Sequence, residues 1–341
     1  MTSLRKLPRR AFLRVGGLGA LGVAAGAVVS QIIHGTAHAM PARQGGHGGD
    51  DGPEMPNFNR DVDHIANGFN PSETLTDFDY GTVSRMPDGR TLREYRLFTG
   101  DKQIEVAPGA LFPAWVYNGR IPGPTLRARE GDLLRIHFTN GSEHPHTMHF
   151  HGVHPANMDG VFEIVQPGQT FVYEFDAEPF GLHLYHCHVM PLAKHIAKGL
   201  YGAFIIDPME DRPAAKEMVM VMHGLDVDFD GVNDFYAVNG IPFHYHNHPI
   251  RIRAGELVRV YLVNILEFDL VNSFHLHANF FHYYPTGTSL TPSEFTDTVI
   301  QGQAQRGILE FRYKYPGMYM FHAHVTEFTE LGWTGMFEVE A

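Results

Sequence analysis

The residues of this sequence with the clearest chemical potential are its histidines and its one cysteine. The chain of 341 residues contains 23 His and a single Cys. Imidazole nitrogen and thiolate sulfur are ligands for transition metals. A lone cysteine excludes an internal disulfide framework and a cysteine-rich zinc module. The composition therefore predicts metal sites built mainly from histidine.

Ten of the histidines lie in short clusters with the spacing of metal ligands. Before residue 210 the clusters are His146–His151, His186–His188 and His195, and after it they are His275–His277 and His322–His324. On a β-strand, residues i and i+2 share a face. His149 and His151 are therefore expected to face one way, as are His186 and His188, whereas Cys187 must face the other way.

This parity predicts two sites on opposite sides of the same strands. One site combines His146, Cys187 and His195, which is the trigonal two-histidine, one-cysteine set of a blue-copper centre. Leu200 stands at the spacing where an axial methionine would be expected, and it cannot coordinate a metal. A missing axial ligand predicts a high reduction potential. The other site uses the paired histidines, whose number suits a cluster of copper ions.

The pattern occurs twice along the chain. Arg127 matches Arg251 and Gly131 matches Gly255 at one offset, and the H-x-H pairs repeat as well. All four paired-histidine positions are His in both copies. The three blue-site positions are instead Asn272, Ala323 and Phe328 in the second copy. Their joint loss indicates that one copy lost a single site.

Short strands must position these ligands. Leu134, Ile136 and Phe138 alternate with polar residues, which is the period of a half-buried β-strand. Strands separated by Gly and Pro turns predict an all-β chain of two tandem sandwiches. The first is expected over residues 76–210 and the second over residues 211–341.

The N-terminal residues have a different composition. Residues 1–39 combine basic residues, an apolar run and the pattern Ala37-His38-Ala39, which together predict a secretory signal peptide. Arg9 and Arg10 resemble the twin-arginine type. Residues 40–75 are expected to be a flexible linker. The mature protein is thus expected to be periplasmic or secreted, without a membrane span.

The charge excludes one function class. The formal net charge is −12, whereas sequence-independent nucleic-acid binding needs a basic surface. No nucleic-acid partner is expected.

The motifs H-x-x-H-x-H, H-C-H and two further H-x-H pairs resemble those of the multicopper oxidases. The sequence is most similar to the two-domain, laccase-like bacterial kind with blue copper in domain 1. The resemblance implies cupredoxin-like Greek-key domains and four copper ions per chain: one type 1, one type 2 and two type 3. It assigns type 1 to His146, Cys187 and His195, with Leu200 axial. It assigns type 2 to His149 and His275, and type 3 to His151, His186, His188, His277, His322 and His324.

The same resemblance implies the activity and the assembly. The family oxidises a small reductant one electron at a time, here phenols or aromatic amines, and reduces dioxygen to water. Related two-domain enzymes complete the three-copper site between subunits, which implies a homotrimer. The eight-residue spacing from Cys187 to His195 is closer to that of copper-containing nitrite reductases, which is the alternative function. A third hypothesis is a non-catalytic electron carrier that uses only the blue-copper site.

Two weaker signals remain. Asp159 lies eight residues after His151, and the resemblance implies a proton-relaying carboxylate near the type 2 copper. An Asp-Gly turn explains this residue equally well. His244, His246 and His248 alternate in a segment expected to be an exposed hairpin, with an extra surface metal site as the alternative.

Overall fold

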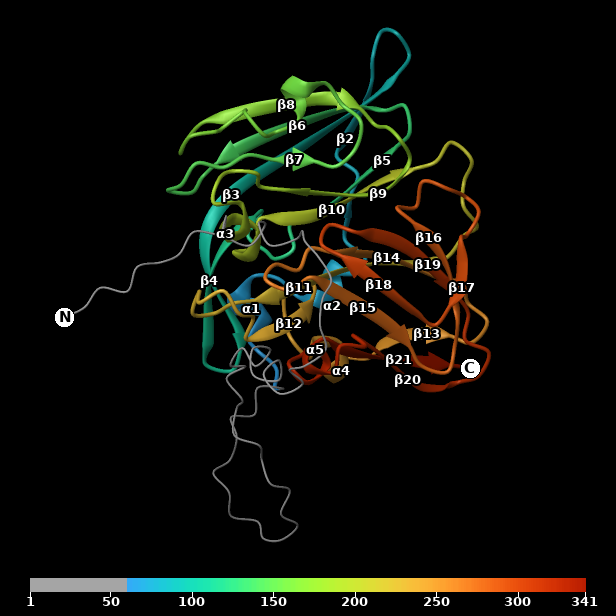
Figure 1. Cartoon of the computed structure of the whole chain (residues 1–341). Coiled ribbons are helices and arrows are strands. Elements are labelled where there is room, and N and C mark those ends of the chain that lie inside the picture. Colours follow the sequence, from blue (N-terminus) through green and yellow to red (C-terminus); the bar gives the residue numbers. More distant parts are fainter. Residues whose placement is uncertain (1–59) are drawn as a thin grey trace, which may run out of the picture. The chain divides into compact units, whose positions relative to one another are not determined.

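The computed structural model describes residues 60–341, which form two β-sandwiches that follow each other along the chain (Figure 1). The first sandwich is drawn in cyan to green and the second in yellow to red. The predicted fold class, two tandem all-β domains of the cupredoxin kind, is confirmed. Strand β10 ends at Asp207 and β11 begins at Lys216, so residues 208–215 connect the two sandwiches.

Two sheets make the first sandwich. In spatial order, one contains β1 (Phe78–Asp79), β5 (Thr125–Arg129), β10 (Tyr201–Asp207), β9 (Gly181–His186) and β7 (His149–Phe150). The other contains β2 (Thr82–Arg85), β3 (Thr91–Ala107), β6 (Leu133–Asn140) and β8 (Thr170–Asp176), and β4 (Ala110–Tyr117) pairs with β3.

The second sandwich also has two sheets. One contains β12 (Phe235–Val238), β11 (Lys216–Leu225), β14 (Val258–Asn264), β19 (Arg306–Phe311), β16 (Phe281–Pro285) and β17 (Glu294–Thr296). The other contains β13 (Ile250–Arg253), β21 (Thr334–Glu340), β20 (Gly317–His322), β15 (Val271–Leu276) and β18 (Thr298–Gly302).

The helices are short; the first two precede β1, and the others lie between strands. They are α1 (His64–Asn67), α2 (Pro71–Thr74), the 3-10 turn η3 (Ala156–Met158), α3 (Leu192–Ala197), α4 (His244–Asn247) and α5 (Thr326–Glu330). No helix within residues 60–341 is long and apolar enough to cross a membrane.

Buried and partly exposed residues alternate in some strands but not in others. In β6, Leu134, Ile136 and Phe138 are buried and the residues between them are partly exposed, as the pattern predicts. Strand β14 is buried along its whole length. One face of β14 lies in the core of the second sandwich, and the other packs with residues of the first, such as Leu184 and Ile205. The two sandwiches therefore share an apolar core.

An ion-pair network lies at this junction. Glu217 accepts hydrogen bonds from Arg127 at 2.6 Å, from Arg259 at 2.8 Å and from the hydroxyl of Tyr261 at 2.8 Å. Arg127 also pairs with Asp207. Burial opposes ionisation of Glu217, but these charged hydrogen bonds hold its pKa below the ordinary value. The network joins β5 of the first sandwich to β11 and β14 of the second.

The expected flexible linker needs correction where the structure describes it. Residues 60–75 carry α1 and α2, with Asp63 capping the first helix and Asn70 the second. Leu75 is buried in the core of the second sandwich, and Asn67 hydrogen-bonds to Glu105 of the first. These caps and contacts order the segment. The predicted signal peptide and residues 40–59 lie outside the described residues.

Candidate metal centres

The first candidate centre lies inside the first sandwich. Cys187 follows β9, His195 lies on α3, and His146 pairs its backbone with Val165. The Cys187 Sγ lies 3.2 Å from His195 Nδ1 and 3.7 Å from His146 Nδ1. The two Nδ1 atoms are 3.2 Å apart. All three side chains are buried, so two imidazole nitrogens and one sulfur converge on one point.

Backbone hydrogen bonds hold these ligands in place. The Cys187 N–H donates to the Leu200 carbonyl at 3.0 Å, and the Leu200 N–H donates to the His195 carbonyl at 3.3 Å. Leu200 is fully buried, and its hydrocarbon side chain has no lone pair to offer. The Thr147 N–H donates to the Cys187 sulfur at 3.4 Å.

The protonation chemistry of this centre suits a metal. Burial lowers the pKa of His146 to about 3 and that of His195 to about 4, so both rings are neutral near pH 7. Burial raises the pKa of the Cys187 thiol. A thiol in such surroundings becomes a thiolate when a cation replaces its proton.

Four histidines gather on the opposite face of the same strands. His149 pairs with His186 across β7 and β9, and His151 Nε2 lies 3.2 Å from His186 Nε2. The rings of His149 and His188 are 5.4 Å apart. His149 Nδ1 donates to the Asp159 carbonyl and His186 Nδ1 to the Cys187 carbonyl. Such bonds fix the ring and leave Nε2 as the ligand atom.

The second sandwich repeats this arrangement. His275 pairs with His322 across β15 and β20, and His277 Nε2 lies 2.9 Å from His322 Nε2. The rings of His275 and His324 are 5.3 Å apart. His275 Nδ1 again donates to a backbone carbonyl, that of Asp297 at 3.0 Å.

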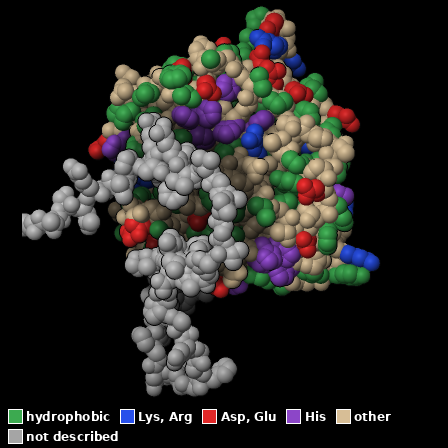
Figure 2. All heavy atoms as spheres, in the orientation of Figure 1, with side chains coloured by type: hydrophobic (Ala, Val, Ile, Leu, Met, Phe, Trp, Pro, Cys, Tyr) green, Lys and Arg blue, Asp and Glu red, His purple; other side chains and the backbone are tan. Residues whose placement is uncertain are grey.

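The two sets of four histidines are separate within the chain. No cluster of ligating side chains in residues 60–341 combines histidines from both sets. Figure 2 shows histidine side chains in two patches, one where β7 and β9 lie and one where β15 and β20 lie. His277 and His324 are exposed. Each set is thus a separate group of four histidines within the described residues.

Known proteins are similar to this chain. Two sequence profiles, each described as multicopper oxidase, match residues 99–211 and residues 211–341. A solved multicopper oxidase is 62% identical with a TM-score of 0.81, and the match covers 82% of this chain and 100% of that one. The chain belongs to the multicopper oxidase family.

Copper-containing nitrite reductases are also similar to this chain. The enzyme of Neisseria meningitidis is 28% identical over 253 residues, which are 67% of this chain and 64% of that protein. The solved copper nitrite reductase from Nitrosomonas europaea is 25% identical with a TM-score of 0.69, covering 73% of this chain and 94% of that one. The chain spans a little under two thirds of the length of the curated nitrite reductases it matches.

Membership of the multicopper oxidase family implies an oxidoreductase that binds copper. The residues fit that metal. The buried nitrogen–nitrogen–sulfur set is the soft set that copper prefers, and clustered imidazoles suit copper as well.

The second sandwich has other residues at the positions that correspond to His146, Cys187 and His195. The Ala323 N–H donates to the Trp333 carbonyl and the Trp333 N–H to the Phe328 carbonyl, which are the bonds that Cys187, Leu200 and His195 make in the first sandwich. The Trp333 indole N–H donates to Asn272 at 3.1 Å. All four residues at these positions are buried. Aromatic rings and an internal hydrogen bond therefore occupy the place that corresponds to the candidate centre of the first sandwich.

Asp159 contacts the first histidine set. Its Oδ1 lies 3.1 Å from His149 Nδ1 and 3.7 Å from His154 Nε2. Asp159 directly follows the 3-10 turn η3, and Gly160 after it has a positive φ of 72°. A Cβ on Gly160 would lie 1.8 Å from the Met148 carbonyl oxygen, so glycine is required at that position. This geometry is thus compatible with both hypotheses for Asp159, a proton relay and a residue of an Asp-Gly turn.

Two features near the histidines were missed by sequence reasoning. Glu267 lines a cavity of about 500 Å³ beside the first histidine set, although it belongs to the second sandwich. No motif marks it, because only the packing of the sandwiches brings it there. His64 approaches His244 and His248. The expected hairpin around His244 is instead helix α4.

Proposed function

We propose that this protein is a four-copper oxidase that couples one-electron oxidation of phenols or aromatic amines to reduction of dioxygen to water. The observation that carries the proposal is the pair of matching histidine sets. Each set has four imidazoles, and in each set ring nitrogens donate to backbone carbonyls. The eight histidines of the two sets are more ligands than one metal ion binds, and their number suits a three-copper cluster.

The proposed ligands are those that the resemblance to the multicopper oxidases assigns. His146, Cys187 and His195 would hold the type 1 copper, with Leu200 in the axial position. His149 and His275 would hold the type 2 copper. The type 3 pair would be held by His151, His186, His188, His277, His322 and His324. Bound at these sites, copper supplies one-electron acceptance and the capacity to activate dioxygen.

The chain positions the reacting partners around these sites. The reductant gives its electron near His195, whose ring lies 4.8 Å from that of Trp115. Cys187 is bonded directly to His186 and His188, so a short covalent path joins the two faces of the strand. Four electrons and four protons convert one dioxygen to two waters. Asp159 can hold a proton at Oδ1 beside His149 and pass it on.

We propose that the three-copper site is completed between chains. The first histidine set needs the second, and the two are separate within residues 60–341. Exposed apolar side chains accompany both sets: Phe162 and Ile164 lie in the loop after β7, and Val271 and Ile300 lie on the strands around His275. Exposed apolar surface marks interfaces. Head-to-tail contacts that close form a ring, so a homotrimer is the expected assembly.

Metal analysis and turnover of the purified protein test the function. We expect at least four copper ions per chain, a blue absorption band that Cys187→Ser abolishes, and oxygen uptake with 2,6-dimethoxyphenol. Loss of the blue band without loss of the other copper ions would assign Cys187 to the type 1 centre. Copper content below four per chain, or no oxygen uptake, would overturn the proposal.

Copper-dependent nitrite reduction is the second candidate function, favoured by the similarity to nitrite reductases. His188 and the complete second histidine set argue against it, because nitrite reductases use a single type 2 copper. Anaerobic production of nitric oxide from nitrite, without oxygen uptake in air, would support this candidate. A protein that binds only one blue copper would instead be an electron carrier.

Export is part of the proposal. The expected twin-arginine signal peptide occupies residues 1–39, which lie outside the described residues. We expect the exported protein to begin at Met40. N-terminal sequencing of the protein from the periplasmic or culture fraction tests this cleavage site.

A further inference from the structure

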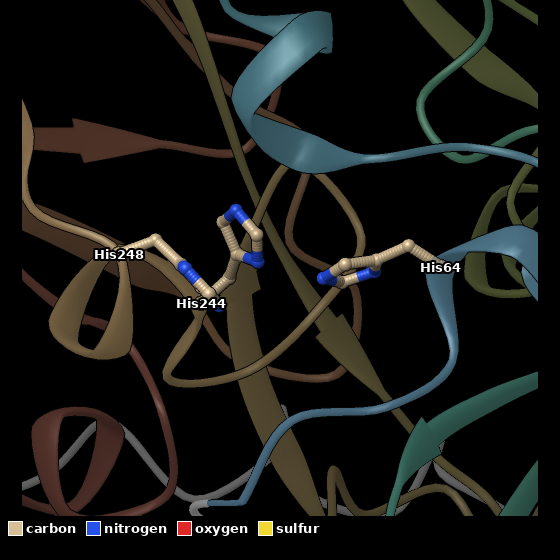
Figure 3. Close-up of side chains that lie close together, drawn as sticks. All are labelled: His64, His244 and His248. Carbon is tan, nitrogen blue, oxygen red and sulfur yellow. The ribbon is translucent and has the colours of Figure 1, made fainter.

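Three histidines outside the copper motifs meet beside helices α1 and α4. His64 begins α1, His244 begins α4, and His248 directly follows α4. One ligand nitrogen from each lies within 4.8 Å of those of the other two. Figure 3 shows the His64 ring extending from the N-terminal segment toward the rings of His244 and His248. His64 and His244, at widely separated positions in the chain, thus belong to one cluster.

Their ring nitrogens are available for a metal. Neither nitrogen of His64 nor the Nδ1 of His244 has a hydrogen-bond partner within residues 60–341, although all three atoms are buried. Buried polar atoms without partners are uncommon in folded proteins. Burial, with His248 and His64 nearby, lowers the pKa of His244 to about 3. That ring is therefore neutral near pH 7, which is the form that binds metals.

The Nε2 atoms of His244 and His248 lie within hydrogen-bond distance of oxygen atoms. His244 Nε2 lies 2.8 Å from the Ser72 hydroxyl, and His248 Nε2 lies 2.9 Å from Asp61 Oδ1. Ligating histidines commonly bond their second nitrogen to an oxygen atom, which orients the ring. For His248 this leaves Nδ1, the nitrogen that would face an ion.

We propose that His64, His244 and His248 form a fifth metal site, which binds one Zn²⁺ or Cu²⁺ ion. Three imidazoles suit both ions and leave a fourth position for water. The site is distinct from the copper centres, because it shares none of their ligands. A bound ion would fasten the N-terminal segment to the second sandwich, so metal binding adds to the stability of that contact.

Metal counting on matched variants tests the site. The full chain is loaded with copper and then dialysed against Zn²⁺ alone or, separately, against Cu²⁺ alone. Mass spectrometry counts the metals per chain. The test variant is His64→Ala, which removes no hydrogen bond among the described residues. The control is His246→Ala, because His246 lies on α4 next to the cluster, is exposed and is not in the cluster.

We expect the wild type and His246→Ala to retain one more ion per chain than His64→Ala in at least one arm. That ion should raise the melting temperature of the wild type and of His246→Ala, but not that of His64→Ala. His248→Ala should behave like His64→Ala. Blue absorption should stay equal in all variants, which separates this site from the copper centres. Equal metal content of the wild type and His64→Ala in both arms would overturn the proposal.

Discussion

At the scale of single residues, Leu200 is the most informative position in the blue-copper candidate. It is buried, and its backbone bonds to both Cys187 and His195. We propose that its side chain occupies the place where a weak axial ligand would bind. Axial ligands tune the reduction potential of such centres, and a hydrocarbon leaves the reduced form favoured. The centre should therefore be strongly oxidising.

The first prediction concerns this position. Leu200→Met should lower the midpoint potential of the blue copper by roughly 60 mV or more, which is a tenfold change for a one-electron couple. Spectroelectrochemical titration of the blue band measures it. Leu200→Ile keeps a hydrocarbon side chain and should leave the potential nearly unchanged. An unchanged potential in Leu200→Met would refute the axial role.

Asp159 supports a second prediction. Asp159→Asn keeps an oxygen that can accept from His149 but removes the exchangeable proton. We expect kcat with dioxygen to fall about 100-fold, while anaerobic bleaching of the blue band by phenol stays at the wild-type rate. Stopped-flow and oxygen-electrode measurements separate these steps.

Asp297→Asn is the matched control for Asp159. Asp297 touches His275 through its backbone carbonyl, which the substitution leaves in place, so kcat should be nearly unchanged. Equal losses in both variants would show that Asp159 does not act through its carboxyl proton.

At the scale of secondary-structure elements, the junction of β5, β11 and β14 depends on a shared carboxylate. Glu217 accepts hydrogen bonds from two arginines that approach from different sandwiches. Removing one member of such a network leaves buried charges without compensation. The elements on both sides then lose the group that holds them together.

The third prediction follows from this network. Glu217→Gln should lower the free energy of unfolding by about 3 kcal/mol near pH 7, measured by urea denaturation. The pKa of Glu217 is held below its ordinary value of 4.5. Its stabilisation is therefore fully present above pH 4.5 and is lost as the pH falls through the lower folded-state pKa. The difference in the free energy of unfolding between Glu217→Gln and the wild type should become smaller at acidic pH.

An exposed ion pair provides the control for Glu217. Glu338 pairs with Arg251 at the surface of the second sandwich, where both side chains are well exposed. Glu338→Gln should cost less than about 1 kcal/mol. A loss as large as that of Glu217→Gln would mean that burial is not the cause.

At the scale of the whole molecule, the two open histidine sets lead to a prediction about assembly. His151→Ala damages the first set and His277→Ala damages the second. Each variant alone should be inactive. Mixed oligomers would combine the intact first set of one chain with the intact second set of another, which restores some sites.

Co-expression of the two variants tests this complementation. With random assembly, about a quarter of the interfaces would be intact, so about a quarter of the wild-type oxygen uptake per chain is expected. A preparation that mixes the variants only after assembly is the control and should stay inactive. No recovery on co-expression would mean that the three-copper site forms within one chain.

The sequence by itself predicted the two-sandwich fold and the grouping of the ligand candidates. Both follow from local rules: strand parity separates Cys187 from His186 and His188, and the repeat aligns the two histidine sets. These rules hold because side chains alternate along any β-strand. These strand rules do not apply to helix α4. His244 and His248 lie on the same side because they are four residues apart, which is the spacing of neighbours on a helix surface.

Only the tertiary structure decided how distant segments meet. It showed that residues 60–75 pack on both sandwiches, that Trp333 is buried at the position equivalent to Leu200, and that β14 is buried on both faces. It also brought His64 to His244. Local patterns could not predict these contacts, because the contacts depend on how the two sandwiches dock through a shared apolar core. The periodicity of buried residues within one segment does not reveal which distant segment it packs against.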